Sequence, residues 1–253
     1  MSGTLEVEVS PRGIATIVLN RPERSNALDQ QILGELMAQF AARAADDRTR
    51  LVVLRGNGKH FCAGADLIAR GQEQGAAPPV SLVDVLGALD LLPKPTVAVV
   101  HGAAIGGGAA IAACCDIVLA AEGAFFSIPE VRVGMAPLGV APFLIRAMGH
   151  RSFRRYGLSG ERIGAAEALR IGLAHDVASP DQLDQKLGEI TDALLHGAPG
   201  ALRELKDELE HYGAPPTAAI MARRATHDPS QSAEAREGIA SFKEKRKPNW
   251  YPG

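Results

Sequence analysis

Short apolar runs recur along the first half of the chain, and glycine-containing loops and helical patterns separate them. Residues 5–9 alternate apolar and acidic side chains, which is the period of a half-buried strand, and residues 13–20 predict a second strand. Almost wholly apolar runs, typical of strands covered on both faces, lie at 51–55, 96–100 and 116–120. This order predicts an α/β fold with parallel strand pairing.

Helical spacing of apolar residues predicts helices over 29–45, with Asp29 as the N-cap, and over 183–195, 202–209 and 233–247. From about residue 152 the pattern is mostly helical, and Pro248 is expected to stop the last helix. The loop 71–79 is rich in Gly, Ala and Pro, and we expect it to be mobile and exposed.

Composition changes this picture by excluding several classes of protein. The 253 residues are 46% hydrophobic and 22% charged, which is typical of a folded globular chain with a sizeable core. Because 27 basic residues face 29 acidic ones, no global basic field exists to attract nucleic acid or an anionic membrane. The one dense basic run, 243–247, contains Glu244 and is interpreted as a solvated helix end.

The cysteines indicate a reducing compartment, and the apolar runs indicate neither a membrane span nor a signal peptide. The 3 cysteines form no C-x-x-C pair, so neither a disulfide framework nor a zinc site is expected. The longest apolar run, 96–113, is broken by His101 and by glycines, and no signal peptide is recognisable in the first 25 residues. We therefore expect a cytoplasmic protein.

The first segment that could carry chemistry is 59–67, directly after a predicted strand. The small residues Ala63, Gly64 and Ala65 would let another molecule approach the backbone and would leave amide hydrogens pointing outward. The alternative is a tight turn in which Asp66 caps the next helix.

The second segment is the glycine run 106–108, which opens an Ala-rich helix. Such a helix start exposes backbone N–H groups and suits an anion, or a carbonyl oxygen that becomes one. The run matches neither a Walker A loop nor a dinucleotide fingerprint. The glycines could equally serve close packing of the helix on the sheet.

The third segment centres on Glu130, which follows Pro129 in an apolar stretch. Apolar surroundings raise the pKa of a carboxyl group toward the range that is useful for proton transfer. The alternative is an ordinary surface Glu paired with Arg132 or with another basic residue.

These segments occur in an order that resembles the crotonase superfamily, the enoyl-CoA hydratases and isomerases. The resemblance covers nearly the whole chain and rests on these stretches: 20–22 (NRP), 26–28 (NAL), 61–66 (FCAGAD), 94–98 (KPTVA), 106–108 (GGG), 115–117 (CDI), 129–131 (PEV), 158–162 (LSGER), 165–168 (AAEA) and 172–173 (GL).

The resemblance implies a crotonase-like spiral of ββα units over 1–195 and a helical C-terminal trimerisation region over 196–253. It implies that the amides of Ala65 and Gly107 form an oxyanion hole for an acyl-CoA thioester, with Glu130 as acid/base. The family's second carboxylate position matches Ala110, which is not acidic.

Further site residues follow from the same resemblance. It implies substrate and CoA contacts at Arg24, Ser25, Ala27, Ala63, Asp66, Leu67, Gly106, Pro129, Phe242 and Lys245. Phe242 and Lys245 match positions that reach a neighbouring subunit's ligand. Neither a metal nor a cofactor is implied, since coenzyme A is part of the substrate. The expected assembly is a homotrimer or a hexamer, with no nucleic-acid or membrane partner.

Three functions remain open. The first is hydration of a 2-enoyl-CoA, as in fatty acid metabolism, with Glu130 as the only acid/base. The stretches 129–137 and 141–143 resemble a branch that includes hydratases and dehydratases of branched or carboxylated enoyl thioesters. In that branch Arg132 would meet a second carboxylate on the substrate, unless it forms a salt bridge on the surface. The second is Δ3-Δ2 enoyl-CoA isomerisation; Leu138 leaves the dienoyl-CoA isomerase pattern incomplete. The third is acyl-CoA binding without catalysis.

Overall fold

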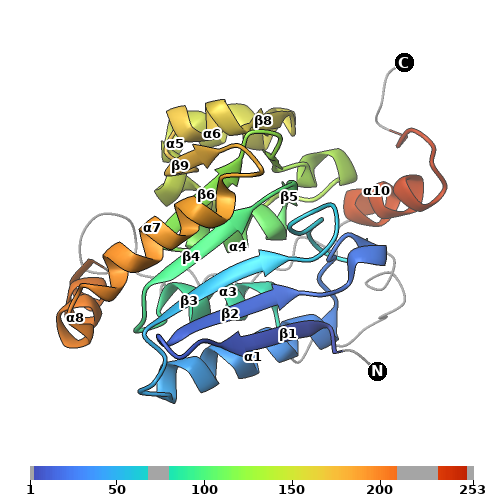
Figure 1. The fold of residues 1–253 in the computed structure, drawn as a ribbon. Helices are drawn as coiled ribbons and strands as arrows, with labels where there is room; N and C mark the ends of the chain where they lie inside the picture. Colours follow the sequence, from blue (N-terminus) through green and yellow to red (C-terminus); the bar gives the residue numbers. More distant parts are fainter. Residues whose placement is uncertain (1–2, 68–79, 210–232, 250–253) are drawn as a thin grey trace.

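The fold is built on two β-sheets, seen in a computed structural model that describes residues 3–67, 80–209 and 233–249 (Figure 1). The larger sheet has six strands in the order β1-β2-β3-β4-β6-β9. Their bounds are β1 (Leu5–Val9), β2 (Ile14–Leu19), β3 (Leu51–Gly56), β4 (Thr96–Val100), β6 (Ile117–Ala121) and β9 (Asp176–Ala178). The smaller sheet has the order β5-β7-β8, formed by β5 (Ala103–Ile105), β7 (Phe125–Ser127) and β8 (Arg162–Gly164).

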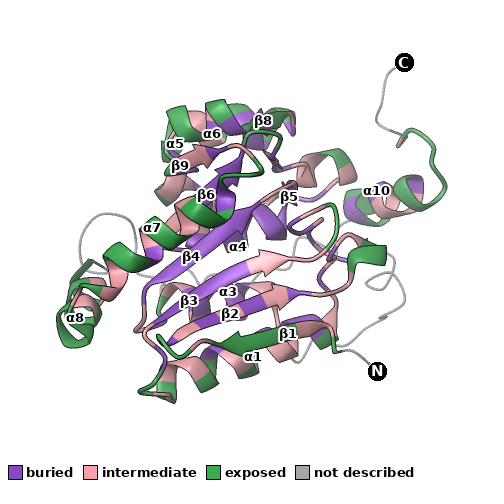
Figure 2. Ribbon diagram, viewed as in Figure 1, coloured by how far each residue is buried: buried purple, intermediate pink, exposed green. Residues whose placement is uncertain are grey.

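The larger sheet is parallel except at its first pair, since β1 runs antiparallel to β2 and the other neighbours are parallel. Burial follows this arrangement (Figure 2). All of β4 and residues 51–54 of β3 are buried, whereas β1 at the edge is mostly exposed. The prediction of an α/β fold with parallel pairing is confirmed, and so are the five predicted strands.

Helices cover both faces of the larger sheet. In Figure 1, α1, α3 and α4 lie behind it and α7 crosses in front of it. The bounds are η1 (Pro22–Arg24), α1 (Gln30–Ala45), α3 (Leu82–Asp90), α4 (Gly107–Cys114), η2 (Glu130–Val133), α5 (Ala141–Ser159), α6 (Ala165–Arg170), α7 (Leu183–Leu195), α8 (Pro199–Leu209) and α10 (Ala233–Lys243). Asp29 caps α1 as predicted, because its carboxylate accepts the Ile32 N–H at 3.0 Å.

The strand order brings the loops after β3 and β4 together. Cys62 and Ala104 form an isolated parallel bridge, and the Cys62 N–H donates to the Ala103 oxygen at 3.0 Å. Parallel neighbours end at the same edge of a sheet, so residues about 40 positions apart meet there. The first two candidate segments therefore lie side by side.

Some local predictions are wrong or incomplete. The short strands β5, β7, β8 and β9 were not predicted, because three residues carry too little alternation to be recognised. The last helix ends at Lys243 rather than residue 247: Lys245 adopts a left-handed φ of 52°, and the Arg246 N–H folds back to the Ser241 oxygen. The loop 71–79 lies outside the described residues, and the division at residue 195 stays a prediction.

None of the helices that the structure describes is long and apolar enough to cross a membrane.

Candidate active site

Two glycine-containing turns meet at the edge of the larger sheet. Gly64 has a φ of +83°, and a Cβ placed on it would lie 2.6 Å from the Ile105 oxygen and 3.4 Å from the Gly107 nitrogen. Any side chain at Gly64 would therefore push the turn away from the start of α4. The turn containing Ala65 and the first amide of α4 are thus in direct proximity, as the interpretation of both segments required.

Both amides at this junction are left without an acceptor in the part of the chain that the structure describes. The Leu28 N–H donates to the Gly64 oxygen at 2.7 Å, and the Asp66 N–H donates to the Leu28 oxygen at 2.9 Å. Backbone groups alternate in direction along such a bridge, so the Ala65 N–H points the other way. Gly107 begins α4, so its N–H has no partner within the helix. Within residues 3–67, 80–209 and 233–249, neither amide donates to a protein acceptor.

Glu130 places its carboxylate against this helix start. A Cβ built on Gly106 would lie 2.7 Å from Glu130 Oε1, and Gly106 itself has a φ of +52°. The Gly106 N–H donates to the Ser127 oxygen at 2.8 Å, which fixes the turn. Pro129 is the N-cap residue of η2. The structure therefore brings the predicted residues Gly106, Pro129 and Glu130 together beside Gly107.

The Glu130 carboxylate is desolvated. Burial raises its pKa to about 7, and its Oε2 is buried with no hydrogen-bond partner in the described part of the chain. Arg132, the alternative partner, donates instead to the Ser159 oxygen at 3.0 and 3.2 Å, where α5 ends. The interpretation of Glu130 as a surface residue paired with Arg132 is therefore wrong. The Arg132 guanidinium stabilises the end of α5 instead.

The other polar groups near this junction are inert or missing. Ala110 is fully buried in α4, so the helix supplies no second carboxylate. The Cys62 thiol donates to the Asn26 oxygen at 3.1 Å, and burial raises its pKa to about 12. A buried thiol of this kind is a poor nucleophile at neutral pH. Glu130 is therefore the one titratable group that the described residues place at the two free amides.

The residues expected to bind coenzyme A lie along one seam. The Ala63 N–H donates to the Ser25 oxygen at 2.9 Å, which ties the loop of Arg24, Ser25 and Ala27 to the turn of Ala63–Leu67. Arg24 is exposed at the end of η1. Asp66 is buried and its carboxylate lies 3.4 Å from the Arg21 guanidinium. The grouping matches the expectation, and the binding role stays a prediction.

Asn26 holds this seam together, and its role was not recognised from the sequence. It is fully buried, and its Nδ2 donates to the oxygens of Asn57, His60 and Phe61 at 2.9, 2.8 and 3.2 Å. Its Oδ1 accepts the Arg21 N–H at 2.8 Å. The available signal was an Asn among turn residues, but its partners lie more than 30 positions away.

Phe242 and Lys245 lie at the far end of α10 and beyond it. The helix packs on η2 of the same chain, but both side chains are exposed, Phe242 by 56%. The structure does not bring them to the Ala65, Gly107 and Glu130 junction. Their contact with a neighbouring subunit's ligand stays a prediction.

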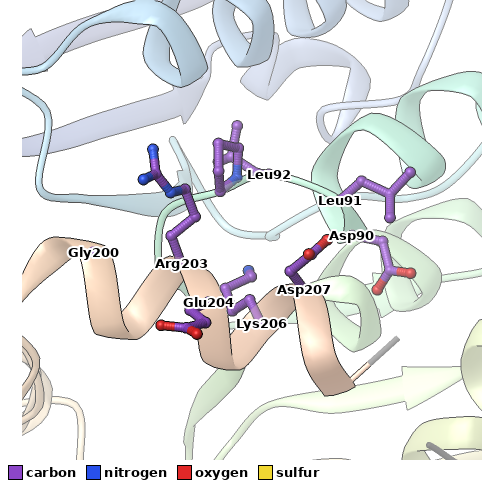
Figure 3. A pocket seen from close by; sticks show the side chains of 9 residues that line it. Asp90, Leu91, Leu92, Gly200, Arg203, Glu204, Lys206 and Asp207 are labelled. Atoms are coloured by element: carbon purple, nitrogen blue, oxygen red, sulfur yellow. The ribbon is translucent and has the colours of Figure 1, made fainter. Parts of the chain in front are cut away.

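A separate groove lies between α8 and the end of α3 (Figure 3). Arg203, Glu204, Lys206 and Asp207 line it from α8, opposite Asp90, Leu91 and Leu92. Lys206 pairs with Asp116 at 2.6 Å and donates to the Lys94 oxygen. None of the predicted site residues lines this groove.

Comparison with known proteins assigns the family. The family model described as enoyl-CoA hydratase/isomerase matches residues 10–252, and the chain belongs to that family. It is 36% identical over 205 residues to enoyl-CoA hydratase AFT6-1 of Alternaria alternata, covering 77% of this chain and 69% of the relative. It is an enzyme of the hydratase or isomerase kind that the family comprises.

Solved structures agree with this assignment. An enoyl-CoA hydratase/isomerase from Pseudoalteromonas atlantica superposes with a TM-score of 0.87 and 31% identity, covering 98% of this chain and 99% of that one. An enoyl-CoA hydratase from Mycobacterium avium subsp. paratuberculosis gives a TM-score of 0.84 at 28% identity, covering 99% of each chain. The predicted crotonase-like fold is confirmed.

Replacing Asn26 by Ala is expected to lower the free energy of unfolding by about 2–4 kcal/mol, because the carbonyl groups of Asn57, His60 and Phe61 lose their shared donor. Urea unfolding measures the change. Asn57→Ala is the control: its side chain bonds to Glu6 and Asn20 near the surface and should cost less than about 1 kcal/mol. Equal losses in both variants would contradict the role given to Asn26.

Replacing Glu130 by Gln is expected to stabilise the protein more at pH 8 than at pH 5. Because the folded-state pKa is raised to about 7, proton binding favours the folded wild type at low pH. That contribution is lost as the pH rises from the unfolded value of 4.5 through about 7. The difference in free energy of unfolding between variant and wild type, measured by urea unfolding, should increase by up to about 3 kcal/mol over this range. A difference in unfolding free energy between variant and wild type that does not change with pH would contradict the burial argument.

Proposed function

We propose that this chain is an enoyl-CoA hydratase that adds water to a 2-enoyl-CoA thioester with Glu130 as its only acid/base carboxylate. The observation that carries the proposal is one desolvated carboxylate, whose Oε2 has no hydrogen-bond partner, beside two backbone amides that donate to no acceptor among the described residues. Negative charge on a thioester oxygen needs such donors, and movement of a proton needs such a carboxylate.

The amides of Ala65 and Gly107 would hold the thioester oxygen. Attack at the β carbon pushes electrons through the conjugated system onto this oxygen, which becomes an enolate. The two N–H groups belong to separate turns fixed by backbone hydrogen bonds, so they need little reorganisation as the charge develops. Each donor of this kind is worth about 3 kcal/mol of transition-state stabilisation in other enzymes.

Glu130 would perform both proton transfers. As a carboxylate it takes a proton from water while the hydroxyl group bonds to the β carbon. As a carboxylic acid it then returns that proton to the α carbon, the enolate collapses to the thioester, and the carboxylate is regenerated. A pKa near 7 suits both roles, since the two protonation states differ little in free energy at neutral pH.

Isomerisation of a 3-enoyl-CoA to a 2-enoyl-CoA is the alternative, and Ala110 favours it. A single carboxylate can remove a proton from the α carbon and return it to the γ carbon without water. The fully buried methyl group of Ala110 offers no second acceptor for a water molecule. Both reactions pass through a thioester enolate, so the amides of Ala65 and Gly107 would serve either one.

The coenzyme A moiety is proposed to bind along the seam of residues 24–27 and 63–67. The exposed Arg24 at the end of η1 would pair with a phosphate group. The hydrogen bond from Ala63 to Ser25 keeps the two walls of this seam together.

Assembly into a homotrimer or hexamer is part of the proposal. Leu205, Leu209 and Phe242 expose 56%, 57% and 56% of their surface on the C-terminal helices. Exposed apolar side chains of this size support burial against another subunit. Light scattering is expected to give three or six chains, and a monomeric mass would contradict the assembly.

Replacing Glu130 by Gln is expected to lower kcat by about 100- to 10,000-fold, because the amide cannot exchange the proton. The assay follows the loss of conjugated thioester absorbance of a 2-enoyl-CoA. Glu122→Gln, an exposed Glu between β6 and β7, is the matched control and should leave kcat unchanged. Wild-type activity in the Glu130→Gln variant would contradict the proposed role.

The pH profile of kcat/KM for hydration should fall below about pH 7, because the free enzyme must hold Glu130 as the carboxylate. The residual activity of the Glu130→Gln variant should not show this fall of kcat/KM below about pH 7. Supplying a 3-enoyl-CoA separates the two reactions: faster formation of conjugated product than hydration of the 2-enoyl-CoA would favour the isomerase.

A further inference from the structure

The C-terminal helix α10 packs directly on η2, the turn that carries Glu130 (Figure 1). The buried face of α10 consists of Ala235, Gly238 and Ser241, which are spaced three residues apart. Ala235 is fully buried and Ser241 is 3% exposed. Helical residues three apart lie on one face, so a stripe of small side chains faces the turn.

The contact is made by backbone against backbone. A Cβ placed on Gly238 would lie 2.1 Å from the Val133 oxygen, and a Cβ on Gly134 would lie 2.3 Å from the Glu234 oxygen. Glu234 and Gly238 are one helical turn apart, so α10 meets the turn at both Val133 and Gly134. Glycine at both positions is what permits this approach.

The turn couples this contact to the carboxylate. The Gly134 N–H donates to the Val131 oxygen at 3.3 Å, and the Met135 N–H donates to the Glu130 oxygen at 3.0 Å. These bonds close residues 130–135 into one compact unit. A displacement of Val133 would therefore also displace Glu130, whose Oε1 lies against Gly106.

The C-terminal end of α10 is held by contacts of its own, separate from the contact with η2. Arg246 pairs with both oxygens of Glu237 at 2.6 and 2.9 Å, and its N–H donates to the Ser241 oxygen. The bidentate pair closes the segment after Lys243 onto the helix. A perturbation at Gly238 is therefore passed to the turn rather than absorbed by unwinding of the helix end.

We propose that Gly238 is a positioning residue, through which α10 docks on η2 and holds the Glu130 carboxylate against the start of α4. This inference rests on the proposed function of Glu130. Gly238 touches neither substrate nor reacting atoms, and it acts only through the place that it fixes for the turn.

The test is Gly238→Ala in the full chain, with Gly188→Ala as the matched control. Both are helical glycines, but a Cβ at Gly188 meets nothing within 4 Å. Gly238→Ala should lower kcat about 10- to 100-fold and change KM by less than about 3-fold, because misplacement near 1 Å costs that much in rate. Gly188→Ala should stay within about 2-fold of the wild type.

Combining Gly238→Ala with Glu130→Gln separates positioning from general damage. If Gly238 acts only through Glu130, the double variant should be no slower than Glu130→Gln alone. The low-pH limb of kcat/KM should also shift to lower pH in Gly238→Ala, as the displaced carboxylate gains water. An unchanged kcat in Gly238→Ala, or an equal further loss in the Glu130→Gln background, would overturn the inference.

Failure of the proposed function looks different, because Glu130→Gln would then be fully active whatever Gly238→Ala does. If Gly238→Ala does not fold, Ala235→Val tests the same contact by adding two methyl groups to the buried face one turn earlier. It should give the same loss of kcat in protein whose circular dichroism spectrum shows that it is folded, and wild-type activity would again overturn the inference.

Discussion

The close approach of two backbone segments is the constraint on which the site depends. The turn at Gly64 and the start of α4 touch without room for a side chain, and a Cβ on Gly108 would lie 2.4 Å from the Cys62 oxygen. Only at such separations do two amides from different parts of the chain reach one small volume. The sheet supplies the approach by ending parallel strands at one edge, and the glycines keep it open.

Desolvation of Glu130 raises the pKa of its carboxyl group and costs the protein stability. Because burial raises the pKa of Glu130 to about 7, the folded state must hold a buried negative charge at higher pH, and this lowers its stability there. No cation in the described residues neutralises it, since Arg132 is committed to the Ser159 oxygen. The carboxyl group of Glu130 is therefore held in place by its apolar surroundings and not by a structural ion pair.

Asn26 and α10 show how distant elements maintain the site. Asn26 fastens the loop after β2 to the loop after β3, and α10 closes on the turn after β7. Neither element supplies an acid, a base or an amide to the junction of Ala65, Gly107 and Glu130. Their contribution is to fix the backbone around residues that do.

The sequence by itself determined five of the six strands of the larger sheet, the start of α1 at Asp29, the glycine-led start of α4 and the candidate group Ala65, Gly107 and Glu130. Periodicity and capping are local properties, and the family resemblance supplied the grouping. Only the tertiary structure decided that Glu130 Oε2 has no hydrogen-bond partner among the described residues, that Arg132 bonds to the end of α5, that Asn26 is buried and that α10 ends at Lys243. Those outcomes depend on contacts between residues far apart in the chain, and desolvation and hydrogen-bond partners exist only once those contacts have formed.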